Sequence, residues 1–252
     1  MRAFPQELVD MVIDKLAEKS SSEKEPKHKI SNYSTVSRQW LARTQKHHFE
    51  FIHFTGHIEL EMWRATIKPD PSGVSWYVRR IVWDNIPTLE GFDEHIRAFT
   101  RVEGVDINGG EILRSLPDVE SLLLLGSSLV TLEIYAERTT PRTMAVLLAG
   151  LPCLRQLHIE LLEVEHDRDD TIAFPSGIMY FEGADSLNLK LGKYLPGGLD
   201  WVSPTARFVY LWIGNMCVHQ NWARVNQWIS SSRGILKYLS IGLDNEGTCL
   251  DQ

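Results

Sequence analysis

"LPDVESLLL" at residues 116–124 and "LPCLRQLHI" at residues 151–159 share one pattern of apolar positions. Within each, an apolar residue is followed three positions later by a second and two positions after that by a third. Such phrases occur at Val78-Ile81-Trp83, Val102-Val105-Ile107, Val119-Leu122-Leu124, Leu129-Leu132-Ile134, Leu154-Leu157-Ile159, Ala184-Leu187-Leu189, Ala206-Val209-Leu211 and Leu236-Leu239-Ile241. A phrase that recurs in this way indicates a repeat architecture with one strand in each unit.

The spacing of the phrases fits repeat units with one exception. Successive phrases begin 24, 17, 10, 25, 30, 22 and 30 residues apart, by subtraction of their first positions. Most of these steps lie in or near the range of about 20–29 residues found in strand-and-helix repeats. The step of 10 is too short, so either one of that pair is not a strand or both share one irregular unit. The four leucines at 122–125 would suit a strand buried on both faces.

Helical stretches precede several of the predicted strands, at residues 91–99, 142–150 and 222–234. Gly150 and Gly234 stand where C-terminal helix caps would fall. Strands that alternate with helices at this period predict an α/β solenoid, with a parallel sheet, outer helices and the curvature of a partial horseshoe. We expect no helix after Leu243. The repeat domain is therefore expected to be incomplete at its C-terminal edge, or covered there by a partner.

A different pattern occupies the first fifty residues. Residues 4–18, "FPQELVDMVIDKLAE", place Leu8, Val9, Val12, Ile13 and Leu16 on one helical stripe. The polar residues 19–29 predict a loop, and helical spacing returns in residues 30–41. Two or three short helices make a marginal core on their own. The stripe must therefore pack on the chain's own core or on another protein, and periodicity alone leaves both open.

Two blocks in this segment resemble the F-box, the motif by which substrate receptors dock onto the adaptor of cullin–RING ubiquitin ligases. Its opening Leu-Pro-x-Glu-Leu element is represented by Phe4-Pro5-Gln6-Glu7-Leu8, and its later Val-Ser-Arg-x-Trp block by Val36-Ser37-Arg38-Gln39-Trp40. Phe4 replaces the usual leucine, and the loop between the blocks is longer than usual. The segment is especially similar to the F-box of basidiomycete fungal proteins, in which a degenerate leucine-rich region commonly follows.

The resemblance implies an F-box at residues 1–56 and a leucine-rich-repeat-like domain at 57–252. It implies adaptor contacts from Phe4, Pro5, Leu8, Val12, Ile13, Leu16, Val36 and Trp40. The function that it implies is that of a non-catalytic substrate receptor in a Skp–cullin–F-box ubiquitin ligase, with a target protein bound by the repeat domain. The alternative is a repeat-based interaction scaffold that acts outside ubiquitination. Either would act inside the cell, in the cytoplasm or the nucleus.

Composition excludes several other classes. A net charge of −7 and a pI near 5.7 argue against nucleic acid and anionic membranes as partners. Three scattered cysteines argue against a disulfide framework and favour a reducing compartment. No apolar run reaches the roughly 20 residues of a membrane span, and no signal peptide is expected, because acidic residues interrupt the first helix.

Motifs that carry chemistry are not found in the sequence, so neither catalysis nor a cofactor is expected. His48, His53 and His57 have metal-like spacing, but without a neighbouring cysteine they are better read as solvated or hydrogen-bonded side chains. Cys153 occupies an apolar repeat phrase and is expected in the core. Three late tryptophans are also expected in the core, with a role as exposed binding anchors as the alternative: Trp212, Trp222 and Trp228.

Overall fold

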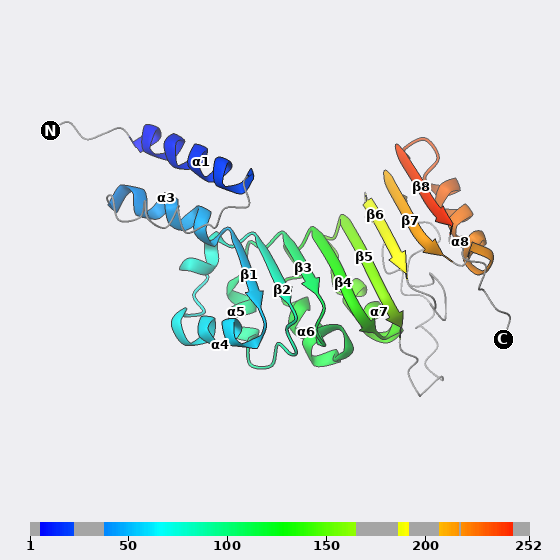
Figure 1. Ribbon diagram of the computed structural model, residues 1–252, viewed down its shortest axis with the longest axis horizontal. Coiled ribbons are helices and arrows are strands. Elements are labelled where there is room, and N and C mark those ends of the chain that lie inside the picture. The colour runs from blue at the N-terminus through cyan, green and yellow to red at the C-terminus, as the bar shows by residue number, and fades with distance from the viewer. Residues whose placement is uncertain (1–5, 23–37, 165–185, 192–206, 217, 244–252) are drawn as a thin grey trace.

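The computed structural model describes residues 6–22, 38–164, 186–191, 207–216 and 218–243. They form an α/β protein on one eight-stranded parallel sheet, in which the strands follow one another in chain order (Figure 1). The strands are β1 Phe51–Thr55, β2 Arg80–Asp84, β3 Gly104–Asn108, β4 Thr131–Thr139, β5 Gln156–Val164, β6 Ser186–Leu191, β7 Tyr210–Met216 and β8 Tyr238–Leu243. The predicted α/β class and parallel sheet are confirmed.

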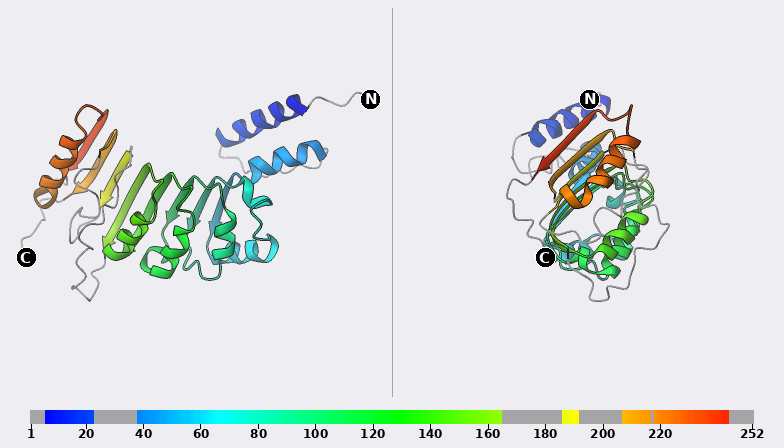
Figure 2. Two further views of the ribbon diagram at one scale, coloured as in Figure 1. Left: turned by 180° about the vertical axis from the view of Figure 1, so that it is seen from behind. Right: turned by 90° about the vertical axis from the view of Figure 1, so that its right-hand side faces the viewer.

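The helices fall into two groups. Those of the sheet are α4 His57–Thr66, α5 Asp93–Ala98, α6 Leu116–Leu123, α7 Pro141–Ala149 and α8 Val218–Ser231, with short 3₁₀ turns η1 Val74–Tyr77 and η2 Ile112–Arg114. The other two, α1 Gln6–Ser22 and α3 Arg38–Phe49, lie beyond the β1 end (Figures 1 and 2). Helix α1 therefore continues through residues 19–22, which the polar composition had predicted as loop.

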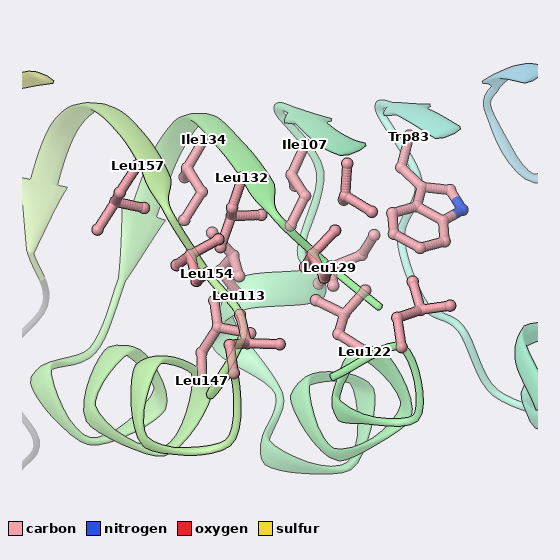
Figure 3. Close-up of a cluster of buried hydrophobic side chains, with 14 of the residues drawn as sticks. Trp83, Ile107, Leu113, Leu122, Leu129, Leu132, Ile134, Leu147, Leu154 and Leu157 are labelled. Carbon is pink, nitrogen blue, oxygen red and sulfur yellow. The ribbon is translucent and has the colours of Figure 1, made fainter. Parts of the chain in front are cut away.

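One continuous core joins the sheet to its helices. From each strand, alternate apolar residues point to the same face, and neighbouring strands hold them in register: Ile81 pairs with Val105, and Val105 with Leu132. Figure 3 shows Leu132 and Ile134 above the side chains that α6 and α7 contribute. Because this face is buried, a shift of one residue would move the whole row to the opposite face, and so the apolar phrases fix the register.

The short step in the repeat has a simple explanation: the phrase at Val119 is helical. Residues 116–123 form α6, and the following leucines, 124 and 125, turn away from it. Ser115 caps the helix, because its side chain accepts a hydrogen bond from the Asp118 N–H, and Pro117 occupies the first turn. The strand predicted at residues 122–125 is wrong, and the strand of this unit is β4.

With two further corrections to the predicted apolar phrases, one in β1 and one in β7, the spacing of the repeat becomes regular. Strand β1 carries an unnoticed phrase, Phe49-Ile52-Phe54, whose last two residues pair with Ile81 and Trp83. In β7 the core positions belong to Phe208-Leu211-Ile213, two residues later than predicted. The eight phrases then begin at 49, 78, 102, 129, 154, 184, 208 and 236, so by subtraction every step is 24–30 residues. Strand β1 thus belongs to the sheet, although it falls within the range assigned to the F-box.

The exits of the first three strands share a left-handed residue. Gly56, Asn85 and Gly109 follow β1, β2 and β3 with φ of 83°, 54° and 67°. Gly56 and Asn85 donate their N–H to the carbonyl of the last residue of the next strand, at 2.8 and 2.7 Å, and Gly109 donates to Tyr135 in the middle of β4, at 2.6 Å. Glycine and asparagine are the residues that adopt this conformation most readily. These short polar exits therefore carry each strand into its connection while keeping it bonded to its neighbour.

We expect Gly110→Ala to destabilise the protein much more than Gly56→Ala. Both glycines have positive φ, 77° and 83°, so each substitution costs about 1–3 kcal/mol in backbone conformation. At Gly110 a Cβ would also lie 2.3 Å from the backbone oxygen of Ile86, whereas nothing lies within 4 Å at Gly56. That overlap should add about 1–3 kcal/mol. Urea unfolding of the two variants measures the difference, and equal losses would contradict the prediction.

Candidate functional site

Helices α1 and α3 form a pair with its own small interior. Helix α1 packs against α3, while α3 also contacts η1 and β1, which ties the pair to the sheet. Val9 and Ile13 of α1 are 0% and 1% exposed, yet they lie outside the main core cluster. At the end of α3, the ring of Phe49 meets the ring of Trp63 in α4 edge to face, with the ring centroids 6.2 Å apart. The pair is therefore a separate layer attached to the sheet at its β1 end.

An ion-pair cluster clamps the two helices together. The Arg43 guanidinium donates to both carboxylate oxygens of Asp14, with Nε to Oδ1 at 2.7 Å. His47 Nε2 lies 2.7 Å from the same Oδ1. The hydrogen bond from Arg43 is the main reason that the pKa of Asp14 is held well below its usual value, and His47 adds to this effect. The bidentate geometry orients α1 on α3 as well as attracting it.

We expect this clamp to weaken in acid. Because the pKa of Asp14 is lowered in the folded state, its contribution to stability is fully present above the unfolded value of 3.8 and is lost progressively as the pH falls from there through the lower folded-state value. Asp14→Asn should therefore lower the unfolding midpoint most at pH 7, and clearly less at pH 2. Glu7→Gln, on an exposed part of the same helix, is the control. An equal effect of Asp14→Asn at both pH values would contradict the assignment.

The outer side of the pair is apolar and exposed. Leu8, Met11 and Val12 of α1 are 40%, 54% and 37% exposed, and Leu41 of α3 is 39% exposed. We call these four residues the outer ridge. Helix α1 is thus apolar on two sides, one used against α3 and one open to solvent. A single exposed apolar side chain is uninformative, but Leu8, Met11 and Val12 are neighbours at i, i+3 and i+4 on α1, and such a group is typical of an interaction surface.

The predicted adaptor-binding residues fall into three groups in this structure. Leu8 and Val12 lie on the outer ridge, and Leu16 and Trp40 are partly exposed. Ile13 is buried in the helix pair, which is the opposite of the exposure that a partner contact needs. Phe4, Pro5 and Val36 lie outside the described residues. The sequence prediction did not include two further exposed apolar residues, Met11 and Leu41. Helical spacing could have identified Met11, which lies three residues after Leu8, and Leu41 directly follows Trp40 of the second block.

A second surface lies on the face of the sheet opposite the core, which we call the open face. Arg80 lies across it: its guanidinium donates to Asp106 at 2.7 Å and to Glu133 at 2.6 Å. Gly104 leaves the space, since a Cβ there would lie 3.3 Å from the Arg80 side chain. Tyr135 continues the row by donating its hydroxyl to Glu133 at 3.0 Å. Side chains from three adjacent strands are thereby joined into one polar network.

Burial changes the acid–base behaviour of this network. Burial raises the pKa of Asp106, and Arg80 opposes the rise. Burial and the hydrogen bond to Glu133 raise the pKa of Tyr135 to about 12, so its hydroxyl remains a donor at neutral pH. The Tyr135 ring also lies against His158, with centroids 4.9 Å apart. An ordered face with acidic and aromatic groups can recognise a partner, but nothing in this geometry provides a nucleophile with an adjacent base.

The remaining candidates of the sequence have ordinary surroundings. His53 Nε2 lies 3.5 Å from Asp84, and His57 Nε2 lies 3.5 Å from Glu61 on its own helix. Among the described residues no group of three or more potential ligands could hold a metal ion. Cys153 is exposed, so its expected core position is wrong.

The three late tryptophans divide between the two roles considered for them. Trp228 is fully buried, Trp222 is exposed and Trp212 is partly exposed on the open face. The expectation of core packing therefore holds for Trp228 and is wrong for Trp222.

Within the described residues, no helix combines the length and apolar character needed to cross a bilayer. Comparison with known proteins adds no relative: no family model matches the chain, and no curated protein or solved structure matches it significantly.

Proposed function

We propose that this chain is a non-catalytic substrate receptor of a Skp–cullin–F-box ubiquitin ligase. The α1–α3 pair docks on the ligase adaptor, and a domain of the leucine-rich-repeat type binds the protein to be modified. The observation that carries the proposal is the outer ridge, which leaves Leu8, Met11, Val12 and Leu41 exposed in the segment that resembles an F-box.

The energetics of the outer ridge support a protein partner. Burying one such apolar side chain fully contributes about 1.5–3 kcal/mol, so three or four anchors would suffice for a stable complex. Met11 is the most exposed of them and its flexible thioether can adapt to an irregular partner surface. The residues that position the ridge, Val9 and Ile13, are already buried within the pair. The ridge is thus held ready before any partner binds, which reduces the entropic cost of association.

The attachment of the pair to the sheet supports a positioning role. Helix α3 contacts β1 and η1 directly, and its last residue, Phe49, begins the apolar phrase of the first strand. A protein held on the open face would therefore be held at a defined distance from an adaptor bound to α1. In a ligase of this type the chemistry belongs to other subunits, and the receptor contributes proximity and orientation.

Direct binding to the adaptor tests the proposal. The full chain and a purified fungal adaptor of the Skp type are mixed and measured by isothermal titration calorimetry. We expect a saturable one-to-one complex. A folded chain that shows no heat of binding and does not co-elute with the adaptor in gel filtration would contradict the proposal. The chain would then be a repeat-based interaction scaffold that acts outside ubiquitination.

A further inference from the structure

The β8 end of the sheet leaves its core open. The residue in register with Leu239 is at most 8% exposed on every other strand, and 0–1% exposed from Ile81 of β2 to Leu211 of β7. Leu239 itself is 40% exposed. At the other end of the sheet, α3 and α4 pack against β1. Among the described residues nothing comparable covers β8, so this end exposes both apolar core and a strand edge.

Strand β8 lacks the usual features that keep a sheet edge from pairing. Its sequence, YLSIGL, contains neither a charged residue nor a proline. Exposed edges are normally protected by charges, prolines, bulges or a covering element. Pairing with β7 is regular from Tyr238 to Ile241, and the irregularity comes only afterwards. Four consecutive residues of β8 therefore present a straight, uncharged edge.

The hydrogen bonds to β7 show which groups are available on that edge. Tyr238 donates its N–H to the carbonyl of Val209 at 3.2 Å. In a parallel pair, alternate residues direct both N–H and C=O to the same neighbour. Tyr238 and Ser240 thus bond toward β7, and the N–H and C=O groups of Leu239 and Ile241 are directed away from it.

We propose that two copies of the chain associate through β8, antiparallel, about a twofold axis that passes between the two Ser240 residues. In this register each Leu239 exchanges two backbone hydrogen bonds with Ile241 of the second copy. Every outward N–H and C=O of these residues is then paired, and an identical patch serves both copies, as a twofold interface requires.

Side chains on both faces fit this register. Leu239 lies opposite Ile241 of the second copy on the core side, so each copy covers the open core of the other. On the open face Tyr238 lies opposite Gly242, an aromatic–glycine pair that stabilises cross-strand contacts. Since β8 carries no charge, pairing brings no like charges together, and the antiparallel direction places the preceding Lys237 of each copy at opposite ends. The α1–α3 pairs stay at the two outer ends of the joined sheet, since they lie beyond β1 (Figure 1).

Sedimentation velocity of the full chain tests the association, at concentrations from about 1 to 100 µM. We expect a dimer to form with rising concentration. Leu239→Lys should prevent it, and so should Leu239→Pro, which removes an outward N–H without touching the bonds to β7. Ile58→Lys, a highly exposed site on α4, should leave the dimer unchanged. The proposal would be overturned if the wild type stayed monomeric at about 100 µM. It would also be overturned if the Leu239 variants dimerised with an affinity within about tenfold of that of the wild type. Circular dichroism shows which variants are folded.

Disulfide trapping tests the register. In an antiparallel ladder a non-hydrogen-bonded pair has its Cα atoms about 4.5 Å apart, within reach of a disulfide. Ser240→Cys, in a chain with Cys153, Cys217 and Cys249 replaced by serine, should therefore form a covalent dimer under mild oxidation. Tyr238→Cys in the same chain should not, because its two copies would be about 14 Å apart along the strands. Trapping by Tyr238→Cys rather than Ser240→Cys would overturn the proposed pairing.

Discussion

Replacing Leu8 and Val12 together with aspartate is expected to weaken binding to the ligase adaptor by about 10²- to 10⁴-fold. Each side chain would lose about 1.5–3 kcal/mol of burial in the complex, and every 1.4 kcal/mol is a factor of ten in affinity. Both residues are exposed in the free chain, so the free energy of unfolding should change little. Isothermal titration calorimetry gives the affinity, and chemical denaturation shows that α1 and α3 remain folded.

The matched control is Ile58→Asp with Met62→Asp, which adds the same charge to two exposed apolar sites on α4. This variant should bind the adaptor like the wild type. If it lost affinity equally, the effect would come from net charge and not from the outer ridge. Ile13→Asp is unsuitable as a test, because a charge in the buried interior of the helix pair would separate α1 from α3 and abolish binding indirectly.

Much of the sheet could be predicted because its apolar phrases repeat at a nearly constant period. Six of the eight phrases found in the sequence mark a strand at the predicted positions, among them Leu129-Leu132-Ile134 in β4. The phrase at Ala206 has the right strand and the wrong register, since Phe208 fits the pattern equally well. Because the pattern counts alanine as apolar, it cannot distinguish the register that begins at Ala206 from the one that begins at Phe208. The larger side chain of Phe208 fills the core, and this decides the register.

The error at residues 122–125 has a different cause. Apolar positions spaced by three and then two residues suit one side of a helix as well as the buried side of a strand. The deciding signal is the segment before them: Ser115 and Pro117 are a helix cap and a first-turn proline. Local capping chemistry was therefore more informative here than periodicity.

The candidate site could be predicted only in part. Helical spacing identifies a stripe on α1 but cannot divide it between an inner side that packs on α3 and an outer side that stays exposed. That division depends on Asp14 meeting Arg43 and His47, residues 29 and 33 positions away. Contacts between two helices joined by a long connection are set by tertiary packing, which one sequence does not reveal. For the same reason the sequence could not show that Ile13, assigned to the adaptor contact, is buried against α3 in the free chain.

Phe208→Ala is expected to lower the free energy of unfolding by about 3–5 kcal/mol. Phe208 is fully buried and meets Trp228 of α8 edge to face, with ring centroids 5.8 Å apart. Its N–H donates to the Ser232 hydroxyl at 2.8 Å, so the same residue joins the start of β7 to the turn after α8. Removing the ring would leave a cavity between strand and helix. Because units of a repeat protein contact mainly their neighbours, the last unit should unfold before the rest.

Tyr210→Ala provides the control for this prediction, because Tyr210 lies two positions further on, is also aromatic and is 48% exposed. Its loss should stay within about 1 kcal/mol. Urea unfolding is followed by tryptophan fluorescence, to which Trp228 and the other seven tryptophans contribute, and by circular dichroism, which reports on the whole chain. A separate early transition in fluorescence for Phe208→Ala would show that the C-terminal unit depends on this residue. Equal losses for the two variants would mean that burial does not set the register of β7, and the corrected 24–30-residue period would lose its seventh member.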